Sequence, residues 1–459
     1  MSYVKTSVGY RRRSKRSRVR KRRVFAFLGF VTLVTLAIWL WNDGHSRGAG
    51  RSVAATPPAP PKSVARAVFS PPWTNRERFA LGTALHDAFA PSLAGAHQWS
   101  LAVLGRDGLL VYDDSSRRAV APASVQKLIV AASALDALGA KYRFHTIFAA
   151  EATPAGGTLD GNLWLVGSGD PSLQSSDLRN GIAVLSRGGV RRINGAVVVD
   201  ATAQTGPGRN PHWGLDDDGQ DYAAPTSAIS LDGDTIESHE MVRGVDQAVW
   251  TPMTDVSRAV AAQTKALLAA RGIALAEPPG FGAAPLDSII LWDHKSAPLG
   301  ALESHMLYVS DNHYAEELLR TVGGAGGEPD DAGGVAAERR FLEREGIPVP
   351  GLRLFDGSGL SPSNRVAAIT IGRLLLSQEA TLYHLLPLGG REGTLADYGF
   401  TSALGRVRAK SGHLSDVSSL AGYANTTHHG RVAFAFLIDG SPADPDASIV
   451  RAIDRLVEF

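Results

Sequence analysis

The chain has 459 residues, of which 44% are hydrophobic, and this length and composition indicate a globular protein of two or three domains. It contains no cysteine, which excludes a thiol nucleophile, a disulfide framework and a thiolate metal site. The net charge of +2 is unevenly distributed, because residues 1–50 hold 12 of the 47 Lys and Arg and one of the 45 Asp and Glu. The rest of the chain has 35 basic and 44 acidic residues, a net charge of −9, so we expect no nucleic-acid binding by the folded part.

A membrane anchor is the first element that the sequence predicts. A basic tail over residues 1–23, with ten Lys and Arg between Arg11 and Arg23, precedes a span over residues 24–42 that begins with eighteen uncharged residues. At about 1.5 Å of rise per residue, such a run is just long enough to cross the hydrocarbon core as a helix. The basic flank predicts a cytoplasmic N-terminus and a body on the extracytoplasmic side of the cell membrane. A cleaved signal peptide, which would leave a secreted protein, stays open as an alternative.

A Pro-rich linker over residues 43–75 separates this span from the folded part. We divide the folded part into a first catalytic segment, residues 76–144, an inserted region, residues 145–280, and a second catalytic segment, residues 281–459. The inserted region is predicted to be largely β, because short β-rich runs alternate there with Gly, Pro, Asp and Asn.

The two catalytic segments should share one sheet. A hairpin is predicted between Gln98 and Tyr112, and a closing pair of strands over Ser419 to Ala424 and Val432 to Leu437. A C-terminal helix should follow from Asp444 onward. Helices and strands on both sides of a long insertion imply one discontinuous α/β domain.

The central helix carries the first chemical motif. Pro122 and Ser124 mark its start, and apolar residues recur with a helical period until Gly139. Ser124 and Lys127 are one turn apart and therefore share a face at the helix N-terminus, where unpaired N–H groups favour negative charge. Ser-x-x-Lys alone is a weak signal, since the N-terminal tail also contains one match.

Two further motifs follow in a fixed order. Ser310-Asp-Asn312 is the only Ser-x-Asn in the chain, and Lys410-Ser411-Gly412 is the only Lys-[Ser/Thr]-Gly. The order Ser-x-x-Lys, Ser-x-Asn, Lys-[Ser/Thr]-Gly is that of the active site of penicillin-recognising serine enzymes.

From about Trp99 to the C-terminus the chain resembles the low-molecular-mass class C penicillin-binding proteins. The segments that extend the match beyond the three motifs are Tyr222–Leu231, Ala315–Leu318, Asp356–Ser361, Gly393–Leu395 and Leu420–Tyr423. The 186 residues between Ser124 and Ser310 match the large insertion of this family, which simple β-lactamases lack.

The resemblance implies a discontinuous penicillin-binding/β-lactamase-like catalytic domain, an antiparallel sheet with helices, that carries the inserted region. It also implies a serine D-alanyl-D-alanine carboxypeptidase, with D,D-endopeptidase activity as a further option. Its partners would be peptidoglycan stem peptides as substrates and β-lactam antibiotics as inhibitors.

By this resemblance Ser124 is the nucleophile and Lys127 takes its proton. A free lysine titrates near 10.4, so a base near neutral pH needs a shift of roughly three units, for which we expect partial burial and the second cation Lys410. Ser310 would relay the proton to the leaving amine, and Asn312 would orient Lys127 and hold the substrate amide.

The resemblance also places the substrate. The backbone N–H groups of Ser124 and His413 would form the oxyanion hole, and Gly412 would leave space for substrate along its strand. Lys410 and Ser411 would bind the terminal carboxylate. Ser411 stands where the family more often has threonine, and Pro362 stands where an arginine is common, so the preference for a stem-peptide side chain stays open.

We predict no metal and no cofactor. The thirteen histidines include no H-E-x-x-H motif, and His428-His429 is expected in a surface turn.

Two other functions stay open. A β-lactamase would need a base for deacylation, but Glu379 and Glu392, between the second and third motifs, lie in no motif that supports this role. A non-catalytic envelope protein that binds or scaffolds the wall would not need intact Ser124, Lys127 and Lys410. The oligomeric state also stays open.

Overall fold

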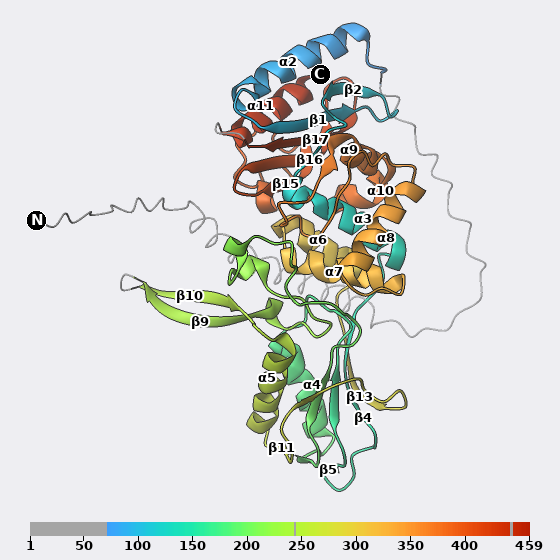
Figure 1. Cartoon of the computed structure of the whole chain (residues 1–459), viewed down its shortest axis with the longest axis vertical. Coiled ribbons are helices and arrows are strands. Elements are labelled where there is room, and N and C mark those ends of the chain that lie inside the picture. The colour runs from blue at the N-terminus through green and yellow to red at the C-terminus, as the bar shows by residue number, and fades with distance from the viewer. Residues whose placement is uncertain (1–70, 243–244, 441–443) are drawn as a thin grey trace, which may run out of the picture. The chain divides into compact units, whose positions relative to one another are not determined.

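The computed structural model describes residues 71–242, 245–440 and 444–459 (Figure 1). The chain divides into two units, Met1–Val68 and Phe69–Phe459, and the description below concerns the second. The predicted basic tail, the membrane span and most of the linker lie outside the described residues. Within the described ranges, no helix is both long and apolar enough to cross a membrane.

The main sheet has five strands in the order β15-β16-β17-β1-β2, and all neighbours are antiparallel (Figure 1). Its strands are β1 (Gln98–Leu104), β2 (Leu110–Asp114), β15 (Val407–His413), β16 (Val417–Asn425) and β17 (Arg431–Asp439). Because β1 pairs with β17, the two ends of the folded part complete the same sheet. The predicted hairpin and closing pair of strands are confirmed.

Alternating side chains divide the core of this sheet into two layers. On one face, Leu101 and Phe436 pack in the core under α2 (Asn75–Leu93) and α11 (Pro445–Glu458). On the other face, Ala102 and its neighbours pack against the central helices. Successive residues of a strand point to opposite faces, and both faces are covered, so β1 and β17 have apolar residues on both faces.

Helices of the second layer surround α3 (Lys127–Leu138), whose first eight residues are all buried. The helices of this layer are α6 (Leu299–Val309), α7 (Asn312–Ala325), α8 (Asp331–Arg344) and α9 (Ala368–Ser377). The helix α3 ends at Gly139, whose φ of 80° is accessible to glycine at little cost. The short elements of this half are β3 (Ala119–Val120), η1 (Ala123–Gln126), β14 (Val366–Ala367), α10 (Glu379–Leu382), η5 (Tyr383–Leu385) and η6 (Gly393–Leu395).

The inserted region has its own five-stranded sheet, in the order β12-β8-β6-β4-β13. It therefore extends to Lys295 and not only to the predicted residue 280, because β13 returns to pair with β4. The strands are β4 (His145–Ala150), β6 (Leu163–Val166), β8 (Val197–Asp200), β12 (Gly280–Phe281) and β13 (Ile289–Lys295). A smaller parallel sheet has the order β11-β7-β5, with β5 (Thr158–Leu159), β7 (Arg192–Ile193) and β11 (Ala274–Leu275).

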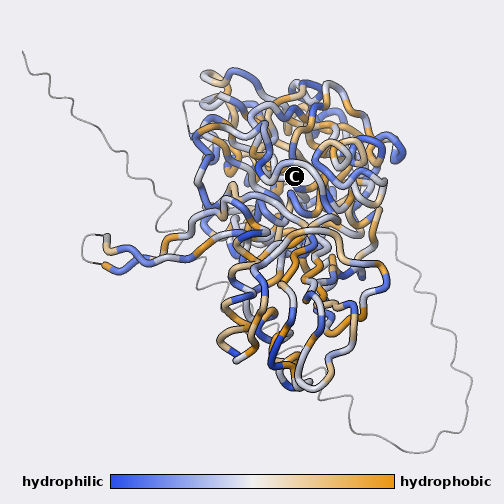
Figure 2. The backbone as a smooth tube through the Cα atoms, turned by 60° about the horizontal axis from the view of Figure 1, so that its bottom comes forward, coloured by the Kyte–Doolittle hydropathy of each residue, from blue (hydrophilic) through white to orange (hydrophobic). Residues whose placement is uncertain are grey.

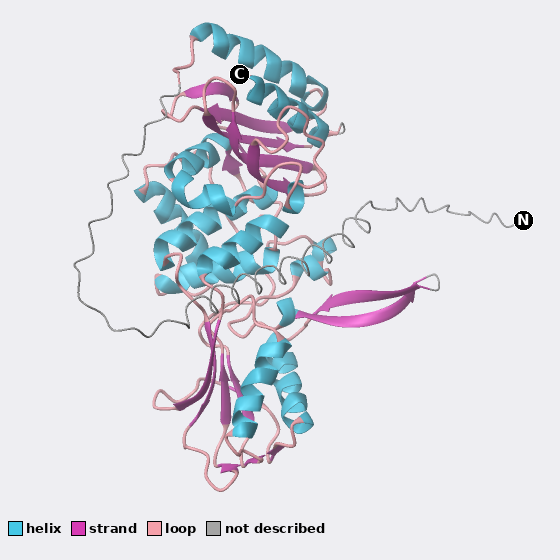
Figure 3. Ribbon diagram, turned by 180° about the vertical axis from the view of Figure 1, so that it is seen from behind, coloured by secondary structure: helices cyan, strands magenta, loops and turns pink. Residues whose placement is uncertain are grey.

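Two helices of this region, α4 (Ser175–Arg187) and α5 (Val256–Ala270), pack on its sheet (Figure 3). The prediction of a largely β region missed them. In α4 the buried residues Leu178, Ile182 and Leu185 recur with a helical period. This periodicity indicates a helix, but it lies between glycines and short β-rich runs that favour strands.

A hairpin of β9 (Thr235–Val242) and β10 (Val245–Pro252) projects from the inserted region (Figure 1). Ile236, Met241 and Val245 are exposed on it, and Figure 2 shows both hydrophilic and hydrophobic stretches along its strands. The remaining short turns of the region are η2 (Leu215–Asp217), η3 (Asp221–Ala223) and η4 (Asp232–Asp234).

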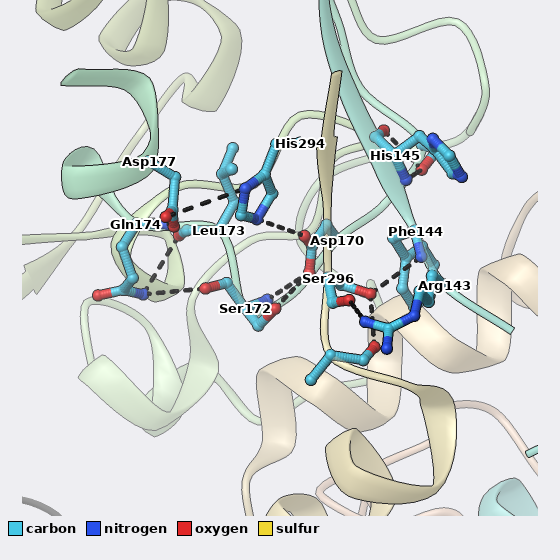
Figure 4. A network of polar contacts seen from close by, with 12 residues as sticks. Arg143, Phe144, His145, Asp170, Ser172, Leu173, Gln174, Asp177, His294 and Ser296 are labelled. Atoms are coloured by element: carbon cyan, nitrogen blue, oxygen red, sulfur yellow. Dashed lines mark hydrogen bonds and ion pairs between the residues drawn. The ribbon is translucent and has the colours of Figure 1, made fainter. Parts of the chain in front are cut away.

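The chain enters and leaves the inserted region at one place, where β4 pairs with β13 (Figure 4). Phe144 N–H donates to Ser296 Oγ at 3.0 Å, Ser296 N–H donates to the Phe144 carbonyl at 3.1 Å, and the Arg143 guanidinium donates to the Ser296 carbonyl. His145 N–H donates to Ser168 Oγ at 2.9 Å. These five residues therefore lie where the antiparallel pair of β4 and β13 leads into the catalytic domain.

Candidate active site

Ser124 lies in a tight turn before the central helix, and not in the helix itself. The sequence predicts one helix from Ser124, whereas the structure has the 3-10 turn η1 first and α3 only from Lys127. Ala123 has φ 47°, a left-handed conformation that is costly for a residue with a side chain. The turn is supported by Ser419 Oγ, which donates to the Pro122 carbonyl at 2.7 Å.

Lys127 is fully buried, and its amine points at Ser124. The Nζ atom donates to Ser124 Oγ at 2.9 Å, to Asn312 Oδ1 at 2.8 Å and to the Ser358 carbonyl at 2.7 Å. Three acceptors match the three N–H bonds of a lysine ammonium. The serine therefore has a buried amine within direct proton-transfer distance.

Burial lowers the pKa of Lys127 from 10.5 to about 8, although the neighbouring carboxylates of Glu316, Asp356 and Asp311 raise it. From the sequence we expected partial burial and the second cation, Lys410, to lower this pKa together. Burial is the main cause. A buried amine with a pKa of about 8 is neutral in a useful fraction of molecules near physiological pH.

The Ser-x-Asn motif forms the sharp connection between α6 and α7. Ser310 ends α6 in a left-handed conformation with φ 62°, and Asp311 caps α7 by accepting from Tyr314 N–H at 3.1 Å. Asn312 is the first residue of α7, and its Nδ2 donates to the Tyr222 carbonyl at 2.9 Å. The connection thus aims one hydroxyl and one amide at the serine turn.

The third motif lies on β15, the edge strand of the main sheet. Lys410 is buried, and its Nζ donates to Ser310 Oγ at 2.9 Å and to the Ser411 carbonyl. Ser411 Oγ donates to Thr394 Oγ1 at 2.8 Å. The structure therefore brings the three motifs together, and each lysine contacts one serine hydroxyl.

Gly412 makes the close approach of β15 to the serine turn possible. A Cβ atom at this position would lie 2.8 Å from Ser124 N and 2.4 Å from Ser419 Oγ. The His413 side chain turns to Asp446, whose two carboxylate oxygens lie 2.9 Å from His413 Nε2. Only the backbone of His413 thus remains for the predicted contact with substrate.

The buried loop Asp356–Ser361 contacts Lys127 through the Ser358 carbonyl, a role that the sequence did not indicate. Asp356 accepts from Gly359 N–H at 3.0 Å, from Ser361 N–H at 2.6 Å and from Trp213 Nε1 at 3.1 Å. These bonds fix the Ser358 carbonyl that accepts from Lys127. The segment Asp356–Ser361 contributed to the resemblance, but nothing in its composition indicates a contact with the lysine.

Glu316 holds the same loop from α7. Its carboxylate accepts from Gly357 N–H at 3.1 Å and from Ser358 N–H at 2.7 Å. Burial, together with the charge of Asp356, raises the pKa of Glu316 to about 8. The base therefore rests on a loop that two buried carboxyl groups organise.

A buried cluster that could hold a metal ion is formed by Asp234, His313 and Glu317, the last two directly after Asn312 and Glu316 on α7. No local motif indicates this cluster, because Asp234 is far from His313 and Glu317 along the chain. His429, expected on the surface, is buried and stacks on Trp73 with ring centroids 3.9 Å apart, while His428 is exposed.

The site combines a serine, a buried lysine beside it and a second lysine on an edge strand. Together with an antiparallel sheet between helix layers, it defines a penicillin-binding/β-lactamase-like serine enzyme. The model of the D-Ala-D-Ala carboxypeptidase 3 (S13) family matches residues 84–244 and 241–458, and the chain belongs to this family. It is a serine-type D-Ala-D-Ala carboxypeptidase and a low-molecular-mass class C penicillin-binding protein, as its motifs indicated.

Two relatives and two solved structures illustrate the similarity. The D-alanyl-D-alanine carboxypeptidase of Actinomadura sp. is 29% identical over 446 residues, covering 80% of this chain and 82% of the relative. Carboxypeptidase DacB of Mycolicibacterium smegmatis is 30% identical over 472 residues, covering 93% and 94%. Penicillin-binding protein 4 of Haemophilus influenzae has a TM-score of 0.74 at 22% identity, covering 82% of this chain and 99% of that chain. The Bd3459 predatory endopeptidase of Bdellovibrio bacteriovorus has a TM-score of 0.51 at 19% identity, covering 74% and 86%.

Proposed function

We propose that the protein releases the terminal D-alanine of peptidoglycan stem peptides through an acyl-enzyme on Ser124. The observation that carries this proposal is the fully buried Lys127 amine, 2.9 Å from Ser124 Oγ. Neither group is unusual alone. Together they form a nucleophile with an adjacent base of lowered pKa.

In the first half of the reaction, Ser124 Oγ attacks the carbonyl carbon of the penultimate D-alanine while Lys127 accepts the hydroxyl proton. The oxyanion of the tetrahedral intermediate is stabilised by the N–H groups of Ser124 and His413. Its collapse breaks the C–N bond. A proton passes to the leaving amine through Ser310, which already accepts a hydrogen bond from Lys410.

In the second half, water attacks the ester carbonyl of the acyl-enzyme. Lys127 again serves as the base, and Ser124 leaves with a proton. This step releases the shortened stem peptide. The other product, the free amine, has already left in the first half. If the leaving amine belongs to a cross-link instead of free D-alanine, the same steps give D,D-endopeptidase activity.

The edge strand β15 orients the substrate. An extended peptide can add to such an edge through backbone hydrogen bonds, and Gly412 leaves room between β15 and the serine turn. Lys410 and Ser411 then meet the terminal carboxylate, with Thr394 holding the Ser411 hydroxyl at 2.8 Å. A free carboxylate next to the scissile bond is therefore the feature that the site selects.

β-Lactams should acylate Ser124 and stay bound. Penicillin-binding protein 4 of Haemophilus influenzae has been solved in complex with a β-lactam. A β-lactamase would need a carboxylate base near the ester. Glu379 pairs with Arg431 and, at 3.1 Å, with Arg106. Glu392 Oε2 accepts from Leu388 N–H at 2.8 Å. Both candidate bases are therefore engaged by groups other than Ser124.

Mass spectrometry of the full-length chain after incubation with benzylpenicillin tests the proposal, with Ser124→Ala as the variant and Ser116→Ala as a matched control. We expect one long-lived adduct in the wild type and in Ser116→Ala, and none in Ser124→Ala. The same samples should release D-alanine from a pentapeptide in parallel. Rapid loss of the adduct would favour a β-lactamase, and an unreactive, correctly folded wild type that still binds peptidoglycan would favour a scaffolding protein.

We also propose that residues 24–42 anchor the enzyme in the cell membrane, with the N-terminus in the cytoplasm and the catalytic body on the side of the cell wall. The support is the uncharged run after ten basic residues. This arrangement would keep the enzyme next to newly made peptidoglycan.

A further inference from the structure

Three ionisable side chains meet in the core where the inserted region packs on α7. His313 and Glu317 are one turn apart on α7 and share a face, and Asp234 reaches them from the turn η4 of the inserted region. All three are buried, and one ligand atom from each lies within 4.8 Å of the others. None of the three is part of the proposed reaction.

From these contacts we infer that Asp234, His313 and Glu317 form a binding site for one divalent transition-metal ion of the zinc type, which fastens the inserted region to the active-site helix. Two carboxylates and one imidazole are a ligand set that suits zinc. The inference is independent of the proposed reaction, because the metal would hold the fold and would not touch the substrate.

The first support is an unsatisfied oxygen that points into the cluster. Asp234 Oδ1 accepts from Leu231 N–H at 2.8 Å, but Oδ2 has no hydrogen-bond partner among the described residues and lies 3.8 Å from His313 Nε2. His313 Nδ1 has no partner in the described part of the chain either. Buried polar atoms of this kind are rare and commonly indicate an ion or a water.

The second support is that the ligands are already oriented by neighbours. Glu317 accepts from Ser227 N–H at 2.9 Å and from Gln204 Nε2 at 2.7 Å. Such outer contacts are typical of ligands that bind a metal. Ser230 Oγ lies 2.7 Å from His313 Nε2, the nitrogen that faces Asp234, so this hydroxyl would be displaced when the metal binds. Two donors on one zinc ion lie about 3.4 Å apart, so movements of about 1 Å would bring the three side chains onto it.

The third support is the shortage of positive charge. Arg320 is the guanidinium that acts on Glu317, but its Nε is engaged by Asp331 at 2.6 Å and its Nη2 by the Pro207 carbonyl. A divalent cation bound between the buried carboxylates of Asp234 and Glu317 would supply positive charge at this place.

The test uses the full-length chain, stripped with a chelator and then given zinc ions. We expect one zinc per chain to remain after desalting, a higher unfolding temperature, and release of protons on binding. Asp234→Asn and Glu317→Gln should each weaken zinc binding by more than roughly tenfold. His239→Ala is the matched control, because His239 is an exposed histidine 3.2 Å from Asp246 on the projecting hairpin, and it should bind zinc like the wild type.

Zinc bound equally by the wild type and Asp234→Asn, lost in His239→Ala, or not retained at all would overturn the inference. The variants could fail to fold. Zinc-soaked crystals of the wild type therefore provide a measurement without substitution: anomalous density must lie between Asp234, His313 and Glu317, and its absence there would equally overturn the inference.

Discussion

At the scale of single residues, Lys127 determines when the enzyme can act. Its amine is mostly neutral above its lowered pKa and only partly neutral below it, and the neutral form is the one that accepts a proton from Ser124. Burial provides the lowered pKa, so the pH dependence of the reaction is set by the same packing that holds the helix α3 in the core.

We therefore predict that the rate of acylation by a labelled penicillin rises with pH and levels off above about 8. Below that value the rate should fall about tenfold for each further pH unit, because the protonated fraction of Lys127 grows. The rates are measured by stopped-flow fluorescence between about pH 5.5 and 9.5. A rate that does not change across this range would contradict a lysine base.

Gly359 supports the serine turn through its missing side chain. It has φ 80°, and a Cβ atom would lie 2.0 Å from the Ala123 carbonyl oxygen. We predict that Gly359→Ala reduces the free energy of unfolding by about 2–4 kcal/mol and slows penicillin acylation, because the turn carrying Ser124 must move.

The matched control is Gly346→Ala. Gly346 has φ 66° but no atom within 4 Å of its would-be Cβ, so only the left-handed backbone is penalised, by about 1 kcal/mol. Denaturant unfolding and acylation rates separate the two variants. Equal losses in both would show that the contact with Ala123 is unimportant.

At the scale of elements, the inserted region reaches the catalytic centre through one loop. Trp213 donates from Nε1 to Asp356 Oδ2 at 3.1 Å, and the Tyr222 carbonyl accepts from Asn312. The inserted region therefore helps to position two of the three acceptors of Lys127, the Ser358 carbonyl and the Asn312 amide.

Trp213→Phe should leave Asp356 Oδ2 without one of its donors and destabilise the protein by about 1–3 kcal/mol. We also expect slower acylation, since the loop under Lys127 loses support. Trp164→Phe is the control, because Trp164 Nε1 makes a weak 3.4 Å contact with Glu151 in a more exposed setting. Acylation at the wild-type rate in Trp213→Phe would mean that the loop does not need the inserted region.

The elements also show what could be predicted from the sequence. Periodicity identified β16, β17 and α11, because both their apolar runs and their boundaries are local signals. The order and uniqueness of three short motifs identified the residues around Ser124. The contact between Lys127 and the Ser358 carbonyl, and the cluster at Asp234, depend on chain segments far apart, and no local pattern encodes such distances.

At the scale of the whole molecule, we predict that the full chain sediments with membranes and resists extraction by alkaline carbonate. A chain that starts at residue 71 should stay in the soluble fraction and still bind penicillin, because the described fold begins there. Fractionation followed by labelled-penicillin gels measures both properties. A soluble full chain with a processed N-terminus would instead indicate a cleaved signal peptide.

The pairing of β1 with β17 has a consequence for biogenesis. The inner strand β1 ends at Leu104, near the start of the described fold, whereas its partner β17, the middle strand of the sheet, begins only at Arg431. A polypeptide emerging from the ribosome or the translocon cannot close this sheet until β17 has been made. A nascent or prematurely terminated product would thus be inert toward the cell wall, which protects the growing envelope from hydrolysis by incomplete enzyme.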